Sequence, residues 1–519
     1  MFQFFKKLRA KTKKNQAVEE KIGKWNEPFE SCKFSSSLDE NIAAIKKLFC
    51  DVDIVRYKII NEGVKDSLRY FLVFFDGMVN GEIINDNIVT PLMAMRVSAT
   101  DSPIDKLIDS VVQVGESTKI DTFKQVIQSV TYGDTVLFAE GCNHAAAFNT
   151  KQFTLRSVSE PDNEKVLSGP REGFTESLMQ NLSQIVRRVR THELKARMLS
   201  LGKRTNTAVC VCYLDSLVDK SILTELFRRL NSIDIDGVLD ENYITELIRD
   251  HPYTPFRATG YTERPDVVIG KLLEGRIAIF VDGTPVVLTI PYLFIENFQS
   301  NEDYYFNFYY TSFARLLRIL AFLLTIAVPG LYIAVVAFHH EMAPLQLLLR
   351  ITLERQGVPL PAAAEAVIML GVFDILRETG VRMPSNIGQA LSIVGALVIG
   401  QAAVEASLVA APMIIVVAAT GITSLLVPKL NAPIIYWRIL LLVLSSAFGF
   451  FGLSVGLALL LVHINNLSSF GVEQISLKGS FKFQDSKDIF IRASWRIMRN
   501  RPERLSRNKV RQTGGNANG

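Results

Sequence analysis

The chain has 519 residues, a formal net charge of +5 and a mean hydropathy of +0.21. That length excludes a single compact domain, and the average apolarity excludes an ordinary soluble protein. Residues 1–310 carry a charge every few positions, whereas long stretches after Leu316 carry none. The sequence therefore predicts a soluble N-terminal region followed by a membrane region.

Basic residues gather at the two ends of the chain. Residues 1–24 contain eight Lys or Arg, and residues 478–511 contain eleven. Beside a bilayer such ends are typical of contact with anionic lipid and of the cytoplasmic side, and no nucleic-acid-reading element accompanies them. Lys6 and Lys7 interrupt the apolar start, which is therefore not a secretory signal. We expect contact with the lipid bilayer, no nucleic acid, and a cytoplasmic N-terminal region.

The five cysteines all precede the apolar region, and their spacing matches neither a disulfide framework nor a zinc site. Cys210 and Cys212 stand two apart in an alternating apolar run, which predicts two thiols on one face of a strand. Reduced cysteines also favour the cytosol for the soluble region.

The soluble region is predicted to be α/β or α+β, with a basic tail at residues 1–37 and two subdomains at residues 38–168 and 169–303. In the first, local patterns predict a helix near Ile42–Leu48, a strand over Tyr70–Phe75, and a hairpin of Thr135–Ala139 and Ala145–Phe148. In the second, they predict a helix from about Thr175, a strand over Ala208–Leu214, a helix over Lys220–Leu230, and a hairpin over Arg276–Pro291 that turns at Asp282-Gly283.

Residues 304–472 are predicted to form an all-α polytopic membrane domain, followed by a basic tail at residues 473–519. Leu320–Phe338 provides 19 residues without a formal charge, ~29 Å as a helix, with a kink expected at Pro329-Gly330. Arg315 and Arg318 are expected to snorkel from its start to the membrane interface. Uncharged runs predict three more spans, at Met383–Val404, Ala406–Pro428 and Ile439–Val472.

The segment Val358–Phe373 differs from these spans because it is short, begins with two prolines and carries Glu365. It is interpreted as a re-entrant or half-length helix. On that interpretation the chain crosses four times and both basic ends lie on one side. Placing Arg377 and Arg382 inside instead gives five crossings, so the sequence leaves both counts open.

The chain carries no nucleophile elbow, phosphate loop or dinucleotide fingerprint in a credible context, so we expect neither an enzyme nor a cofactor. His339-His340-Glu341 has a metal-like composition, but its place at a membrane edge favours an interfacial loop. No metal site is predicted.

Polar and small residues inside the predicted spans are the informative feature. A carboxylate at membrane depth is costly unless hydrated or paired, and a helix rich in Gly, Ala and Ser packs closely or lines a narrow path. The alternatives are a tightly packed bundle helix and, for Glu405, a turn in the headgroup layer. The candidate pore or gating residues are Glu365, Gly388, Gln389, Ser392, Gly395, Gly400, Gln401 and Glu405.

A set of short motifs runs through residues 40–475. They are Arg156 with Glu160-Pro161 and Glu164, Gly169-Pro170-Arg171-Glu172-Gly173-Phe174, Thr262-Glu263-Arg264-Pro265-Asp266, Glu274-Gly275-Arg276, Glu302-Asp303-Tyr304-Tyr305, Pro329-Gly330-Leu331-Tyr332, Leu376-Arg377-Glu378, Arg382-Met383-Pro384 and the run Ile393 to Val404. Together they resemble the A subunits of the GerA-type nutrient germinant receptors of bacterial spores. The sequence departs from the family pattern at Leu370, where an acidic residue is usual, and at Glu473-Gln474-Ile475, where a proline-rich segment is usual.

The resemblance implies a multi-pass receptor subunit in the inner spore membrane, working with a permease-like B subunit and a lipoprotein C subunit. It also implies that copies of the chain assemble into a channel that releases cations, and that the motif residues 169–173 and 263–266 are structural. Two other functions stay open: a secondary transporter that binds the nutrient itself, and a membrane-anchored scaffold that transmits a signal.

Overall fold

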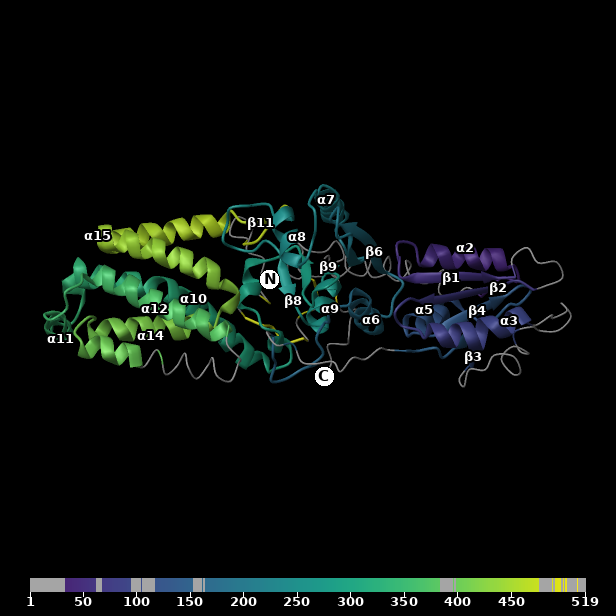
Figure 1. Ribbon diagram of the computed structural model, residues 1–519, viewed down its shortest axis with the longest axis horizontal. Coiled ribbons are helices and arrows are strands. Elements are labelled where there is room, and N and C mark those ends of the chain that lie inside the picture. Colours follow the sequence, from purple (N-terminus) through teal and green to yellow (C-terminus); the bar gives the residue numbers. More distant parts are fainter. Residues whose placement is uncertain are drawn as a thin grey trace, which may run out of the picture. The chain divides into compact units, whose positions relative to one another are not determined.

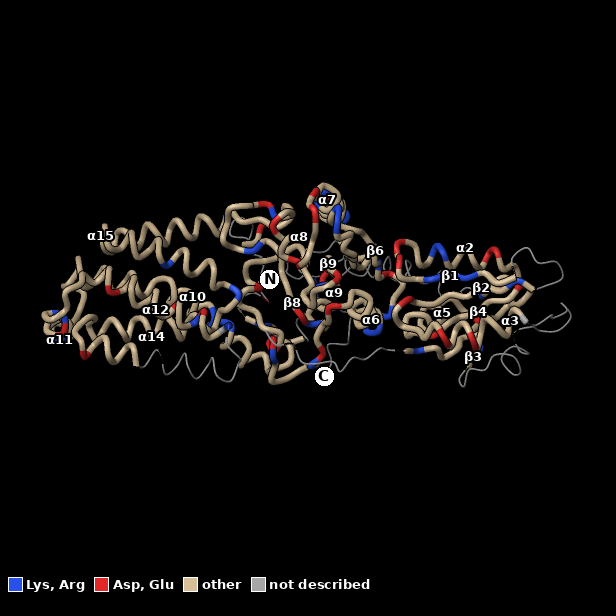
Figure 2. Tube along the Cα trace, viewed as in Figure 1, with Lys and Arg blue, Asp and Glu red and all other residues tan. Residues whose placement is uncertain are grey.

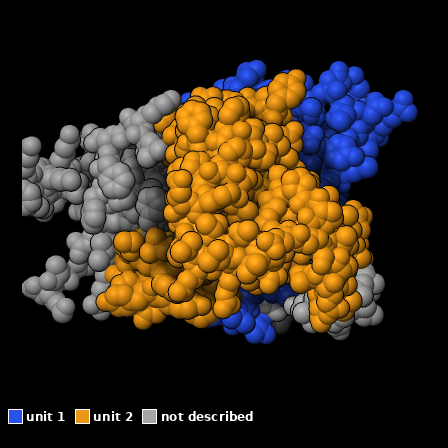
Figure 3. Space-filling view, turned by 90° about the vertical axis from the view of Figure 1, so that its left-hand side faces the viewer, with its two compact units in different colours: residues 1–249, 259–291, 495–519 blue, residues 250–258, 292–494 orange. Residues whose placement is uncertain are grey.

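The computed structural model describes residues 33–61, 68–94, 104, 117–152, 161, 164–382, 395, 398–475, 488, 491–495, 498, 500–501 and 511. The chain divides into two compact units, coloured separately in Figure 3. We call residues 1–249, 259–291 and 495–519 the sheet unit, and residues 250–258 and 292–494 the helical unit.

The first sheet of the sheet unit is antiparallel throughout, with strand order β1-β2-β4-β5-β3 (Figure 1). Successive residues of a strand point to opposite faces, so Phe71 packs in the core that holds α2 and α5, whereas Leu72 packs in the core that holds η1. The predicted strand at Tyr70–Phe75 and the predicted hairpin of Thr135–Ala139 and Ala145–Phe148 are confirmed. The elements are α2 (Leu38–Leu48), β1 (Val55–Ile60), β2 (Tyr70–Phe75), the π-helix η1 (Ile83–Val89), α3 (Thr90–Ala94), β3 (Ser117–Ile120), α5 (Phe123–Thr131), β4 (Thr135–Ala139) and β5 (Ala145–Phe148).

The second sheet of the sheet unit is also antiparallel, with strand order β6-β7-β9-β10-β8. The hairpin predicted over Arg276–Pro291 turns at Gly283, whose φ of +89° suits glycine. The Sγ atoms of Cys210 and Cys212 are 3.7 Å apart and buried, which confirms two thiols on one strand face. The elements are α6 (Leu178–Arg188), β6 (Leu194–Leu201), β7 (Thr207–Leu214), α7 (Lys220–Asn231), α8 (Glu241–Ile248), β8 (Gly260–Thr262), α9 (Pro265–Leu273), β9 (Ile277–Val281) and β10 (Val287–Ile290).

Within the described residues, the helical unit contains two helical stretches that are long and apolar enough to cross a membrane, Phe308–Ala337 and Pro428–Asn465, judged by length and composition; Ala411–Leu425 is a shorter apolar helix. Figure 2 shows long uncharged stretches along α14 and α15. The elements are η3 (Phe294–Phe298), η4 (Asn301–Tyr304), α10 (Phe308–Ala337), η5 (His340–Met342), α11 (Leu345–Arg355), α12 (Ala362–Arg382), α14 (Ala411–Leu425), η6 (Pro428–Leu430), α15 (Asn431–Asn465), β11 (Ser468–Ser469) and β12 (Val472–Glu473).

Helix α15 is a hairpin of two arms, because the chain reverses at Gly449, where φ is 60° and ψ is −135° (Figure 1). The rings of Trp437 and His463 are 5.5 Å apart across the two arms. The arms pack so closely that a Cβ added at Gly456 would lie 2.3 Å from Leu441 Cδ2. The prediction of one span over Ile439–Val472 is therefore wrong, because the helix begins earlier and folds back on itself.

Two other span predictions and the predicted half-length helix differ from the structure in their limits. The helix predicted as half-length over Val358–Phe373 is α12, which begins after Pro361 and continues for 21 residues to Arg382. The span predicted over Ala406–Pro428 is the 15-residue α14. Most of Met383–Val404 lies outside the described residues. Leu320–Phe338 falls largely within α10, which begins at Phe308 and keeps Pro329 inside it.

Candidate functional site

Glu365 is a wholly buried carboxylate at a joint of three helices. It lies in the first turn of α12, and its Oε1 forms an ion pair with Arg355 Nη2 of α11 at 3.2 Å. Its Oε2 accepts a hydrogen bond of 3.2 Å from the backbone N–H of Ala410, the N-cap residue of α14. Burying a carboxylate requires such partners, and the positive end of a helix dipole stabilises the charge further. The sequence singled out Glu365 as a carboxylate inside a predicted membrane segment, and the structure supplies its partners, Arg355 and the backbone N–H of Ala410.

The other candidate pore residues do not join Glu365 in one cluster of bonds. Gln401 Nε2 donates to Glu405 Oε1 at 3.0 Å, and both side chains are exposed. Gly395 and Gly400 face neighbouring helices: an added Cβ would meet Leu376 Cδ2 at 3.2 Å and Ile414 at 3.7 Å respectively. The candidates Gly388, Gln389 and Ser392 lie outside the described residues.

A second ion pair, which the sequence analysis missed, joins α12 to α15. Asp374 pairs with the buried Arg438, and Arg377 lies 3.5 Å from the same carboxylate. Asp374 follows the predicted half-length helix and Arg438 precedes a predicted span, so the pattern marked both residues only as the ends of membrane segments. Their pairing across 64 residues leaves no local signal.

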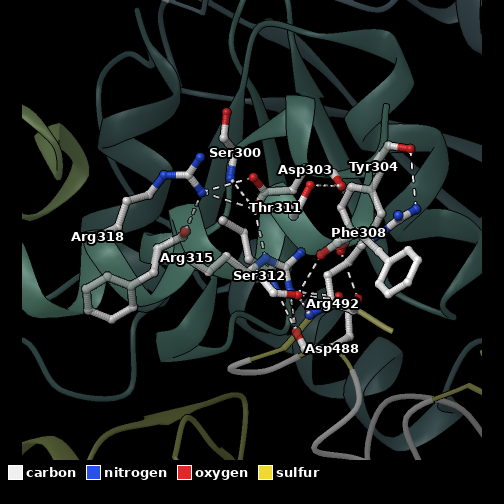
Figure 4. Close-up of polar contacts among 12 residues, drawn as sticks. Ser300, Asp303, Tyr304, Phe308, Thr311, Ser312, Arg315, Arg318, Asp488 and Arg492 are labelled. Atoms are coloured by element: carbon white, nitrogen blue, oxygen red, sulfur yellow. Dashed lines mark hydrogen bonds and ion pairs between the residues drawn. The ribbon is translucent and has the colours of Figure 1, made fainter. Parts of the chain in front are cut away.

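Charged side chains also converge where α10 begins, and we call Asp303, Arg315, Arg318 and Asp488 the α10 ion cluster (Figure 4). Arg315 Nε donates to Asp303 Oδ2 at 2.8 Å, and Arg315 Nη1 donates to Asp488 Oδ1 at 2.8 Å. Arg318 Nη1 lies 3.1 Å from both oxygens of Asp303. The prediction that Arg315 snorkels to an interface is wrong, because its side chain is 0% exposed and bound to two carboxylates.

In the sheet unit, two of the sequence motifs lie together around the buried side chain of Arg264. Its Nε and Nη2 bind Asp266 at 3.1 Å, and its Nη2 donates to the carbonyl of Pro170. The backbone N–H of Phe174 donates to the carbonyl of Glu263 at 2.8 Å. These contacts tie residues 169–174 to residues 262–266.

The other motif residues flank this contact. Glu172 accepts hydrogen bonds from Arg187, at 2.9 and 3.0 Å, and from Arg188 at the end of α6. Pro265 begins α9, and Gly169 has a φ of +116°. The carbonyl of Gly173 accepts from Gln184 Nε2 at 3.3 Å, and Arg171 is exposed.

Within the described residues, no group of three or more His, Cys, Asp or Glu is placed to hold a metal ion. In the His339-His340-Glu341 segment, each histidine Nδ1 instead lies near a backbone carbonyl at the end of α10, at 3.3 Å from Ala334 and 3.2 Å from Val335.

These features define a protein of two parts: antiparallel α/β sheets, and apolar helices joined by buried ion pairs. Comparison with known families then identifies the group. The chain belongs to the family described as Bacillus/Clostridium GerA spore germination protein, whose model matches residues 43–504. This confirms the family predicted from the sequence motifs.

Individual relatives match over most of their length. The chain is 39% identical to spore germination protein KA of Bacillus subtilis (strain 168), over 92% of this chain and 88% of that protein. It is 38% identical to an uncharacterized membrane protein, YfkQ, of the same organism, over 91% and 92%. It is 34% identical to spore germination protein GerLA of Bacillus cereus, over 84% and 89%.

The chain is also similar in sequence to a solved structure. The crystal structure of the N-terminal domain of the A subunit of the Bacillus megaterium spore germinant receptor GerK3 is 30% identical, covers 51% of this chain and 98% of that chain, and gives a TM-score of 0.41.

Proposed function

We propose that this chain is the A-type subunit of a nutrient germinant receptor in the inner spore membrane, and that copies of its helical unit assemble into a nutrient-gated cation channel. The proposal includes a permease-like B subunit and a lipoprotein C subunit as partners, with the N-terminal region on the core side. Membership of the spore germination family supports the receptor role.

The observation that carries the channel proposal is the buried carboxylate of Glu365 among apolar helices. A charge in such a place is costly and marks function by default. Its partners hold the start of α14, against which Gly400 packs. Gly400 is thereby connected through α14 to a charged joint, which is an arrangement suited to gating a narrow path.

An even number of crossings is supported by the two ends of the helical unit. Phe298, which precedes α10, and Ile464, at the end of α15, share one hydrophobic core. The tip of the α15 hairpin is at the other end, since a Cβ added at Gly449 would lie 2.8 Å from Phe338 Cβ. A chain that enters and leaves at the same end keeps both basic segments on one side.

The test is a flux measurement of monovalent cations across vesicles that contain the chain with its B and C partners. A defined mixture of amino acids, sugars and potassium chloride serves as the nutrient. Gly395→Leu and Gly400→Leu are expected to reduce the flux or shift its dependence on nutrient. Gly371→Leu is the matched control, because the space around Gly371 is open. Assembled complexes that pass no cations with nutrient present would contradict the channel.

A scaffold is the second candidate, and it is favoured by the pairing of the polar groups: Glu365 is bound by Arg355, and Gln401 is bound to Glu405. Such pairs also occur in a helix bundle that only anchors. Replacing residues 383–430 by an inert apolar span would leave germination intact for a scaffold and abolish it for a channel. Nutrient binding by the isolated chain, lost in Glu365→Gln, would instead indicate a transporter.

A further inference from the structure

The C-terminal segment binds the first turns of α10 through Asp488 and Arg492 (Figure 4). Asp488 contributes both its carboxylate, to Arg315 Nη1 at 2.8 Å, and its backbone carbonyl, to the same atom at 2.9 Å. Its second carboxylate oxygen accepts from the hydroxyl of Tyr304 at 2.9 Å. Gln299 Nε2 adds a hydrogen bond of 3.0 Å to the carbonyl of Asp488.

Arg492, which follows Asp488 by four residues in the sequence, also binds α10. Ser312 Oγ accepts from the backbone N–H of Arg492 at 3.1 Å and lies 3.4 Å from its carbonyl oxygen. The guanidinium groups of Arg315 and Arg492 lie 5.7 and 5.9 Å from the centre of the Tyr304 ring. Cation–π contacts of this kind add to the ion pairs.

The charge balance makes this attachment conditional on Asp488. Among the described residues of the α10 ion cluster, Arg315 is paired with both Asp303 and Asp488, and Arg318 is paired with Asp303. Without Asp488, the wholly buried Arg315 would share Asp303 with Arg318. A buried charge that loses one partner must gain water or another anion. Departure of Asp488 would therefore leave Arg315 with less negative charge around it and favour a rearrangement of the first turns of α10.

We propose that Asp488 and Arg492 form a latch, with Asp488 as the positioning residue, that holds the start of α10 in the resting state and is released when the receptor responds to nutrient. The latch extends the channel function proposed above. It rests on that function, because release of the latch is measured as cation release through the channel. Its attachment can be followed separately, because a segment distant in sequence contacts one defined site on α10.

The first experiment locks the latch with a reversible cross-link. The side chain of Ser312 touches the backbone of Arg492, so the double variant Ser312→Cys/Arg492→Cys places two thiols within reach of a disulfide. Cys32 and Cys50 are replaced by Ser to remove competing thiols. The full chain is studied in spores with its partner subunits, and the cross-linked form is detected by its altered mobility on a non-reducing gel.

Three results are expected of the double variant. The nutrient mixture lowers the cross-link yield when it is added before the oxidant. After oxidation, cation release slows about tenfold or more, because even ~1.4 kcal/mol of added resting-state stability changes the ratio of states tenfold. Dithiothreitol restores the rate. Each single-cysteine variant is the control and is expected to respond to oxidant no more than wild type does.

The second experiment releases the latch. Asp488→Asn keeps the size of the side chain and removes its charge, and release of cations is expected at lower nutrient concentrations or without nutrient. Tyr304→Phe removes only the hydroxyl contact, so its effect is expected in the same direction and smaller. If Asp488→Asn does not accumulate, the cross-linking experiment tests the latch without it.

The outcomes separate the latch from the channel. A fully cross-linked double variant that releases cations as fast as its single-cysteine controls overturns the latch. If even wild type releases no cations, the channel fails, and the latch is then decided by the cross-link yield. A nutrient-dependent drop in that yield supports the latch, and an unchanged yield overturns it.

Discussion

The two units of this protein use buried positions differently. In the sheet unit, strands such as β2, β4 and β9 bury runs of apolar residues on both faces, so each strand can be recognised from local pattern, and the buried Arg264 pairs with Asp266 only two residues away. In the helical unit, Arg315, Glu365 and Arg438 are buried with ionic partners from other helices or from the C-terminal segment. The comparison teaches that apolar cores are visible in a sequence, whereas the ion pairs that join helices are not.

The largest expected effect comes from breaking the α10 ion cluster. Arg315→Ala leaves Asp303 and Asp488 without their shared cation, and loss of one partner of a buried pair costs about 3–5 kcal/mol. Thermal unfolding of the full chain in detergent, followed by circular dichroism, measures this loss. Arg318→Ala is the control: its side chain is 19% exposed, so a smaller loss is expected. Equal losses for the two variants would show that burial of Arg315 does not set the cost.

A pair of glycine substitutions sharpens the comparison within the helices. A Cβ at Gly452 would lie 2.0 Å from the backbone oxygen of Leu444, so Gly452→Ala must separate the two arms of α15 and is expected to cost about 1–3 kcal/mol. Gly371→Ala meets open space in α12 and is expected to be neutral or to stabilise by up to ~1 kcal/mol. The same unfolding measurement compares them. A neutral Gly452→Ala would contradict the close packing of the hairpin.

The smallest expected effect is chemical and concerns the sheet unit. A hydrogen bond with Cys212 and burial raise the pKa of the Cys210 thiol well above its usual value, so little thiolate is present near neutral pH. At pH 8, iodoacetamide is expected to label the exposed Cys50 and to leave Cys210 unlabelled until the protein is denatured. Peptide mapping by mass spectrometry reads each site. If Cys210 is labelled as fast as Cys50 in the folded protein, β7 is exposed at the surface and the prediction is wrong.

Whether a feature could be predicted from the sequence depends on how far apart along the chain its interacting residues are. The strand at Tyr70–Phe75 and the hairpin turning at Gly283 depend on neighbours within a few residues, and both were predicted. Arg315 and Asp488 are 173 residues apart, so the charge pattern suggested a snorkelling arginine instead. The reversal at Gly449 did have a local signal, the pair Gly449 and Gly452 around two phenylalanines, but an uncharged run of that length was interpreted as one span.

The hairpin form of α15 has a consequence for how the chain would enter a bilayer during synthesis. Residues 439–462, including the tip at Gly449, contain no Asp, Glu, Lys or Arg. A formal charge at the centre of a bilayer costs about 2.5–3.5 kcal/mol by insertion measurements. Under the proposed membrane topology, the two arms could therefore enter the bilayer together, as one unit, without moving a charged loop across the hydrocarbon core.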